Sequence, residues 1–291
     1  MAIPITGSTA TVVSVSASTD VKYLFDVLKI SEVGINLEAD EFDISELSGS
    51  GSAVERLSGL RSGTMSFSGF YPKSAPKMGN TGLVTYSGSA VAYVADWTMD
   101  VDFGETEITS FAATGPTVKQ YIPNGIFTWG GSFNAHALDD TAVTLPASVG
   151  STGTAAIFQI FKGTTNNHTL NGNVLLKSLG HSVRKADKQV LAYSYSGSGA
   201  LTETEGDSYD PLRVDPASSS AGTATAWGIP SYDLSTSPMK PSIVVKTYEA
   251  GGTDRQYTFS AFLKSLNISV SPGNPIAISG TLRIFNAISN T

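Results

Sequence analysis

Apolar and polar residues alternate in short runs along most of this chain, which is the pattern of β-strands with one buried face. The clearest run is residues 97–103, where the odd-numbered residues are apolar and Thr98, Asp100 and Asp102 lie between them. Because successive strand side chains point to opposite faces, this run predicts a strand with one polar face. Similar runs predict strands at residues 65–71, 126–133, 157–161, 193–196, 243–248 and 266–270.

Helical periodicity is scarce, so the pattern predicts a mainly β protein. One short helix is expected around residues 138–145, where acidic residues would favour the first turn and Pro146 would end it. A Gly/Ser run at residues 48–53 predicts a long hairpin loop. Residues 202–237 form a longer low-complexity stretch, which we expect to link two units or to clasp a neighbouring subunit.

Two kinds of segment each occur twice, in the order first, first, second, second. The tetrapeptide Leu-Lys-Ser-Leu stands at residues 176–179 and again at residues 263–266, 87 positions later. Neighbouring apolar positions match at this shift, up to a one-residue slip that would pair Val190 with Ile276. The other kind repeats at a shift of 64 positions, where Val33, Ile35 and Leu37 correspond to Trp97, Met99 and Val101. Two such matches on strand-like positions indicate an internal duplication.

This order predicts a nested arrangement of two similar domains. The outer domain would comprise residues 1–76 and 225–291, the inserted domain residues 77–202, and residues 203–224 would connect them. Insertion of one domain into another is tolerated at an exposed loop. Pairing of strands between different chains would produce the same sequence pattern, so both arrangements stay open at this point.

Charge and composition narrow the function classes. The chain has 18 Lys and Arg against 25 Asp and Glu among 291 residues, a formal charge of −7, which is the wrong sign for gripping nucleic acid phosphates. It has no cysteine, which excludes disulfides and thiolate metal sites. Charged residues are only 15% of the chain, so we expect neighbours to cover much of the surface. No signal peptide and no membrane span are expected.

Several motifs resemble those of tail tube proteins, also called major tail proteins, of tailed bacteriophages. The opening motifs are Asp-Ile-Ser at residues 43–45, Gly-Leu at 59–60 and Met-Ser-Phe-Ser-Gly at 65–69. The closing motifs are at residues 262–266, 270–275 and 278–282. These are patterns of apolar and turn residues, not catalytic signatures. The inner copy departs from the pattern, since it has Pro-Asn-Gly at residues 123–125 in place of Gly-Leu.

This resemblance implies two β-sandwich or β-barrel domains, each flanked by a short helix, whose sheets join those of neighbours. Rings with a continuous inner β-barrel would stack into the channel for DNA ejection. Because six tube domains usually complete a ring in this family, a chain with two domains would close as a homotrimer with pseudo-sixfold symmetry. The resemblance further implies assembly in the host cytoplasm, a place in the virion tail of siphovirus type, and a tape measure protein in the lumen.

In such a tube an acidic lumen wall would repel passing DNA. The candidates are Glu38, Asp40, Asp100 and Asp102, with a solvated strand face as the alternative interpretation. A second candidate region is the Gly/Ser loop, which would reach the adjacent ring or remain a free hairpin tip; its residues are Ser50, Gly51, Val54, Glu55 and Arg56.

Other chemistry has little support in the sequence. The acids of residues 100–107 could hold calcium but lack the full loop spacing, so no metal is expected. His136, His168 and His181 stand in separate segments, and neither a nucleophile elbow nor a nucleotide-binding glycine loop is present, so no catalysis and no cofactor are expected. The alternatives are a virion decoration protein, adhesin or carbohydrate-binding module, a polysaccharide hydrolase, and the tube of a contractile injection system.

Overall fold

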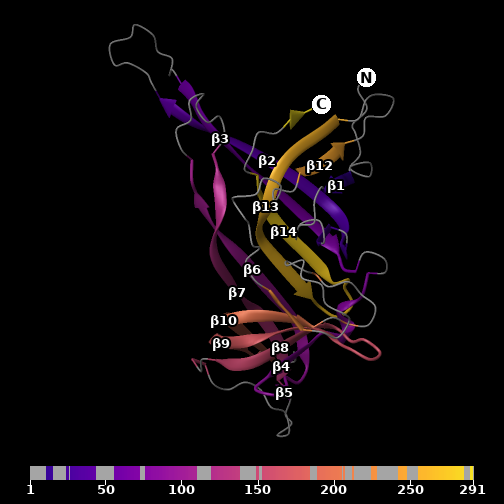
Figure 1. Cartoon of the computed structure of the whole chain (residues 1–291). Helices are drawn as coiled ribbons and strands as arrows, with labels where there is room; N and C mark the ends of the chain where they lie inside the picture. Colours follow the sequence, from indigo (N-terminus) through magenta and orange to yellow (C-terminus); the bar gives the residue numbers. More distant parts are fainter. Residues whose placement is uncertain are drawn as a thin grey trace.

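Alternating apolar and polar runs become long β-strands in the computed structural model of this chain. It describes residues 11–15, 24–25, 27–43, 56–72, 76–109, 119–137, 149–150, 153–183, 189–204, 206, 212, 224–227, 242–247, 255–284 and 289–290. These residues are mainly β, and their strands form one large antiparallel sheet that does not close on itself (Figure 1). None of the helical residues described belongs to a helix long and apolar enough to cross a membrane.

The main path of the sheet contains eleven strands. In spatial order they are β2 (Lys29–Asp43), β3 (Arg56–Phe70), β14 (Ala277–Ile284), β13 (Arg255–Val270), β6 (Val94–Glu107), β7 (Tyr121–Ala137), β10 (Gln189–Thr204), β9 (His168–Ser182), β8 (Thr154–Phe161), β4 (Leu83–Tyr86) and β5 (Ser89–Ala90). Off this path, β1 (Thr11–Val15) pairs with β12 (Ser242–Thr247), β12 and β15 (Ser289–Asn290) pair with β13, and β11 (Ala224–Trp227) pairs with β10.

One strand order occurs twice in this sheet. The first set is β2-β3-β14-β13, with β12 on the first half of β13 and β1 beyond it; the second is β6-β7-β10-β9, with β8 on the first half of β9 and β4 beyond it. The two sets meet where β13 pairs with β6. In Figure 1, β6 and β7 lie between the group containing β2, β3, β13 and β14 and the group containing β8, β9 and β10.

Irregularities in the strand ladders recur at the spacing of the sequence repeat. The β2–β3 ladder shifts between Ile30 and Glu32 and again after Ala39, and the β6–β7 ladder shifts 64 positions later, after Val94 and after Phe103. A bulge is a local feature that a family keeps in place. Its recurrence therefore supports duplication independently of side-chain identity.

The second repeat keeps its shift of 87 positions through the β9–β10 and β13–β14 ladders. It also keeps this shift in the β8–β9 and β12–β13 ladders up to Gln159, where the β8–β9 ladder alone is irregular. Lys177 of β9 and Lys264 of β13 are both bypassed at a bulge. The expected one-residue slip at Val190 is wrong, because Val190 lies opposite Ser182 just as Ala277 lies opposite Ser269. A slip by one residue would have turned the buried side chains to the other face.

The core lies on the apolar face of the sheet, where aromatic rings pack between layers. Phe158 of β8 contacts Trp97 of β6 and stacks on Tyr195 of β10, with ring centroids 5.7 Å and 4.7 Å apart. The indole N–H of Trp97 donates to the carbonyl of Gln159 at 3.2 Å. β8 therefore covers the apolar face of β6 and β10 and closes the second layer over the main sheet.

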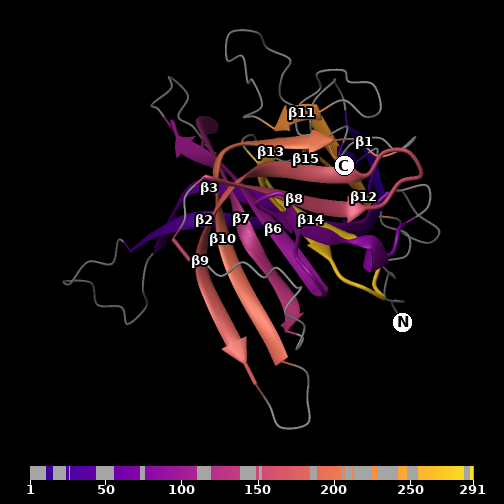
Figure 2. The ribbon, with the colours of Figure 1, turned by 90° about the horizontal axis from the view of Figure 1, so that it is seen from below.

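β10 changes direction part of the way along its length. Its ladder with β9 shifts between Ser198 and Leu201, and Gly199 between them has a φ of +79°, which favours glycine. Figure 2 shows β10 turning toward β11 at one end. This bend lets the first half of β10 belong to the main sheet while its second half, with β9 and β11, joins the covering layer.

The expected strands are confirmed where they are described: all seven lie within β3, β6, β7, β8, β10, β12 or β13 but for one terminal residue in two of them. The expected helix at residues 138–145 and the Gly/Ser loop at residues 48–53 lie outside the described residues. A helical turn that the sequence did not indicate is present at Leu24, whose carbonyl accepts from the N–H of Leu28 at 3.1 Å. Within residues 202–237, β10 continues to Thr204 and β11 returns to pair with it.

Candidate functional site

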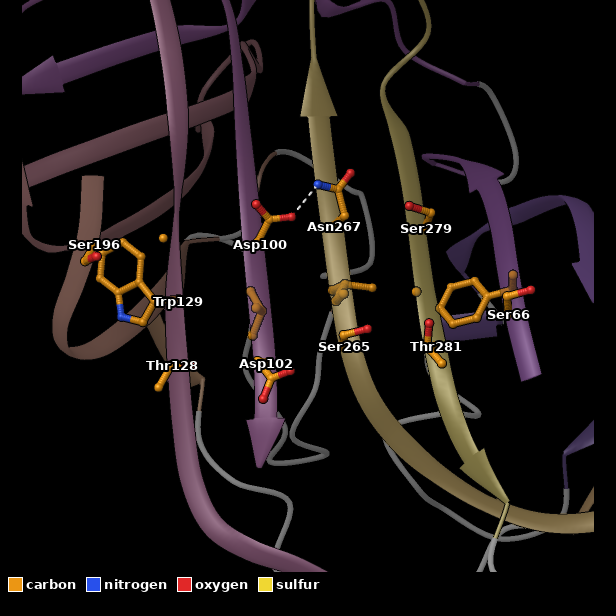
Figure 3. A pocket seen from close by; sticks show the side chains of 15 residues that line it. Ser66, Asp100, Asp102, Thr128, Trp129, Ser196, Ser265, Asn267, Ser279 and Thr281 are labelled. Carbon is orange, nitrogen blue, oxygen red and sulfur yellow. Dashed lines mark hydrogen bonds between the residues drawn. The ribbon is translucent and has the colours of Figure 1, made fainter. Parts of the chain in front are cut away.

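The face of the main sheet opposite the core is polar and hollowed. Residues of β3, β14, β13, β6, β7 and β10 line an open hollow of about 560 Å³ (Figure 3). The polar side chains around it are those of Ser66, Asp100, Asp102, Thr128, Ser196, Ser265, Asn267, Ser279 and Thr281. Short hydroxyl and amide side chains fill little space, so the hollow follows from the residue types at these positions.

Strand register brings these residues together from distant parts of the chain. One row crosses five strands, in which Ser66, Thr281, Ser265, Asp102 and Thr128 stand opposite one another in turn. Side chains of residues paired in antiparallel strands point to the same face. The row is therefore a continuous polar band across the sheet, including the joint between β13 and β6.

The charged residues among those lining the hollow are Asp100 and Asp102. Asn267 donates from Nδ2 to Oδ1 of Asp100 at 2.7 Å, a hydrogen bond across the joint between β13 and β6 (Figure 3). Burial, followed by the negative charge of Asp100, raises the pKa of Tyr195 well above its ordinary value. Both aspartates are exposed, so the hollow presents negative charge to solvent.

Glu38 lies on the same face as the two aspartates, because Gly34 stands opposite Ser66 and Glu38 follows it at an even spacing. The amide of Asn36 donates to Oε1 of Glu38 at 2.9 Å. Three of the four acidic residues expected from the sequence, Glu38, Asp100 and Asp102, therefore share one polar face.

Asp40 has a different environment from these three acids. It lies at a ladder irregularity of β2 and forms an ion pair with Lys119, whose Nζ is 2.9 Å from Oδ2. The hydrogen bond to Asp40 raises the pKa of Lys119 above its ordinary value. Because a cation partly neutralises Asp40, this residue adds less negative potential than the other three.

A charged cluster that the sequence did not indicate lies where β13, β6 and β14 run side by side. Arg283 donates from Nε to Oε2 of Glu105 at 2.9 Å and from Nη2 to Oε1, and Nζ of Lys264 is 3.0 Å from Oε1. Burial alone would raise the pKa of Glu105, but the hydrogen bonds from Arg283 and Lys264 outweigh it and lower the pKa below its ordinary value. The guanidinium of Arg283 also lies 4.4 Å from the ring centroid of Tyr121.

The acidic residues of the run 100–107, considered above as calcium ligands, lie along one strand. Residues 100–107 belong to the extended strand β6 and do not form a turn that would gather their carboxylates. Within the described ranges, no group of three acidic or histidine residues could hold a metal ion. Glu105 instead has two cations as its partners.

A second cluster is enclosed in the covering layer. Nε2 of His168 lies 2.7 Å from Oε1 of Glu203, and both residues are fully buried. The hydroxyl of Tyr71 lies 3.3 Å from Nδ1 of His168, and the N–H of Leu212 donates to Glu203 at 2.7 Å. This network pins the beginning of β9 to the end of β10. The sequence could not predict this network, because its members lie far apart along the chain.

The remaining sequence candidates lie away from these clusters. His136 is on β7, and His181, near the end of β9, lies 3.2 Å from Oε1 of Gln189 through its Nε2. Of the loop residues expected to reach an adjacent ring, Ser50, Gly51, Val54 and Glu55 lie outside the described residues, and Arg56 begins β3.

Comparison with known proteins finds no matching protein family and no similar curated protein.

Proposed function

We propose that this chain is a structural subunit of a bacteriophage tail tube. Its copies close into rings, and the rings stack around the channel through which DNA is ejected into the host. The observation that carries this proposal is a repeated set of four strands already joined edge to edge, β13 to β6, in one sheet with a hollowed polar face.

Two tube domains make up each subunit in this proposal. Residues 1–76 and 225–291 form the outer domain, residues 77–202 the inserted one, and residues 203–224 connect them. The repeated strand order and the coincident ladder shifts support this division. The last two residues of β10, Glu203 and Thr204, fall within the connecting segment and extend the inserted domain by a short distance. β11 pairs with β10, so residues 225–227 at the start of the second outer-domain segment lie on the inserted domain.

Two strand edges of the sheet support the proposed ring closure. In the described part of the chain, β2 pairs with β3 alone, and the last part of β9 pairs with β10 alone. Edges of this kind invite further strand pairing unless they are covered. Three copies supply six similar domains, so a closed ring is a homotrimer with pseudo-sixfold symmetry, and closure leaves neither of these two edges free.

The polar face forms the lumen wall. Its hydroxyl and amide groups are short and neutral, and Asp100, Asp102 and Glu38 add negative charge. Such a wall repels phosphate groups, so DNA passes without being held. A tape measure protein occupies the same lumen before ejection. The subunit is thus a virion tail component that assembles in the host cytoplasm and performs no catalysis.

Electron images of the negatively stained protein over a concentration series test this function. Rings or hollow tubes with threefold symmetry and six similar lobes per ring are expected. A compact monomer at every concentration would reject the tube, and the β-sandwich binding module, as a decoration protein, adhesin or carbohydrate binder, would take its place.

A further inference from the structure

The two unpaired edges of the sheet expose apolar side chains whose counterparts in the repeat are buried. Leu37 of β2 is 56% exposed, while Val101, 64 positions later on β6, is 1% exposed. Leu179 of β9 is 38% exposed, while Leu266, 87 positions later on β13, is 1% exposed. Val183 just after β9 is 61% exposed, and Val270 is 1% exposed.

The buried counterparts all lie at the joint between β13 and β6. There Leu266 stands opposite Val101, and Val270 stands opposite Trp97. Residues 265–270 are the part of β13 that pairs with β6, and moving them back by 87 positions yields residues 178–183 at the end of β9. Moving β6 back by 64 positions yields β2. The same joint between those edges would place Leu179 opposite Leu37 and Val183 opposite Val33.

We infer that β2 of one copy pairs antiparallel with the end of β9 of a second copy, in this register. The partner is a second copy of this chain, and the inference rests on the proposed function for the closed ring that such pairing builds. Within one copy the two edges do not pair with each other, because the sheet is open and six strands lie between β2 and β9.

Charge at the two edges is complementary in the same register. At the internal joint Lys264, in the bulge of β13, lies 3.0 Å from Glu105, in the ladder shift of β6. Their counterparts at the same shifts are Lys177, in the bulge of β9, and Glu41, in the ladder shift of β2. Both counterparts are exposed in the single copy. Lys177 of one copy therefore pairs with Glu41 of the next.

Paired cysteines test the register directly, since the chain has no cysteine of its own. The matched variant carries Leu37→Cys with Leu179→Cys, and the control carries Leu37→Cys with Val183→Cys, which misplaces the thiols by four residues or about 13 Å. A disulfide forms only when the two Cα atoms are within about 7 Å. Mild oxidation should convert the matched variant to covalent dimers and trimers at about tenfold or greater yield than the control.

Charge exchange is a second test that leaves the apolar contacts intact. Lys177→Glu or Glu41→Lys alone should raise the concentration needed for oligomers about tenfold or more, because like charges then face each other. The double variant should recover assembly to within about threefold of the original chain. Lys162→Glu, an exposed charge reversal outside the joint, serves as the control.

The outcomes separate this register from the proposed function. Matched crosslinks without rings would support the register and reject the tube. Rings in electron images without preferential matched crosslinks, or with charge reversals that have no effect, would overturn the register and leave the tube standing. Neither rings nor crosslinks would reject both.

Discussion

At the residue scale, His168 and Glu203 form a polar pair that is enclosed in the described core. Breaking a buried charged or polar pair by removing one partner leaves the other without compensation. His168→Leu leaves Glu203 enclosed with the N–H of Leu212 as a donor but without its imidazole partner. We expect the free energy of unfolding to fall by about 3 kcal/mol or more.

Urea unfolding followed by tryptophan fluorescence measures this loss. The matched control is His181→Leu, at an exposed histidine of the same strand, for which a change below about 0.5 kcal/mol is expected. Equal effects of the two substitutions would show that the enclosed network does not contribute as described.

Glu105 makes stability depend on pH. Its pKa is lowered in the folded chain from the ordinary value of 4.5, so the unfolded state binds a proton more readily. Its contribution is therefore fully present above that value and is lost as the pH falls through the lower folded pKa. Glu105→Gln should cost about 2 kcal/mol at neutral pH and should weaken the dependence of stability on pH below 4.5.

Unfolding midpoints at a series of pH values check this sign. Glu107→Gln, which removes an exposed carboxylate two residues further on in the same strand, is the control and should change the free energy of unfolding at neutral pH by less than about 0.5 kcal/mol. An unaltered profile in Glu105→Gln would contradict the assigned role of Arg283 and Lys264.

The face of a strand on which a side chain lies could be predicted from the sequence, but most hydrogen-bond partners of these side chains could not. Alternation along residues 97–103 correctly placed Asp100 and Asp102 on the polar face. The partners of Asp100 and Glu105, Asn267 and Arg283, lie 167 and 178 positions away. Such contacts depend on which strands become neighbours, and no local pattern carries that information.

At the element scale, glycines set how closely aromatic side chains can approach a neighbouring strand. A Cβ on Gly197 of β10 would lie 2.0 Å from the indole of Trp129, which also donates to the carbonyl of Gly199. Gly197→Ala must therefore displace that ring, and we expect a loss of about 1–3 kcal/mol in the free energy of unfolding. A Cβ on Gly180 of β9 would have its nearest neighbour at 3.8 Å, so Gly180→Ala should be tolerated.

Thermal unfolding of the two alanine variants tests this difference. A similar midpoint for both would mean that Trp129 does not pack on Gly197. Near-ultraviolet circular dichroism of Gly197→Ala gives an independent reading, since a displaced indole changes its asymmetric environment.

The duplicated strands could be recognised from sequence because apolar positions recur at fixed shifts. The predicted slip at Val190 is wrong because positions 276 and 278 are both isoleucine, so either could be aligned with an apolar residue of β10. Only the strand ladders show that Ile278 corresponds to Leu191. The bend of β10 at Gly199 was also beyond prediction. A single glycine in a Ser- and Gly-rich run gives no sign of which residue turns.

At the scale of the whole molecule, the proposed lumen depends on charge more than on any single contact. Asp102→Lys places a cation on the polar face at an exposed position. The assembled variant should retain duplex DNA at low salt, whereas the original assembly should not, and added salt should release it. Asn167→Lys, exposed between β8 and β9, adds a lysine away from the hollow and should bind little DNA.

Fluorescence anisotropy of labelled duplex over a salt series measures this retention. Equal DNA binding by the Asp102 and Asn167 variants would place the polar face outside the channel and return its acids to an ordinary solvated strand face.

A cryo-electron microscopy reconstruction of the assembled protein, at a resolution that separates strands, tests the proposed tube most directly. We predict three copies in each ring, a continuous inner sheet in which β9 of one copy adjoins β2 of the next, and the polar face with Asp100 and Asp102 lining the channel. Monomers at all concentrations, or rings whose inner wall is the opposite face of the sheet, would contradict it.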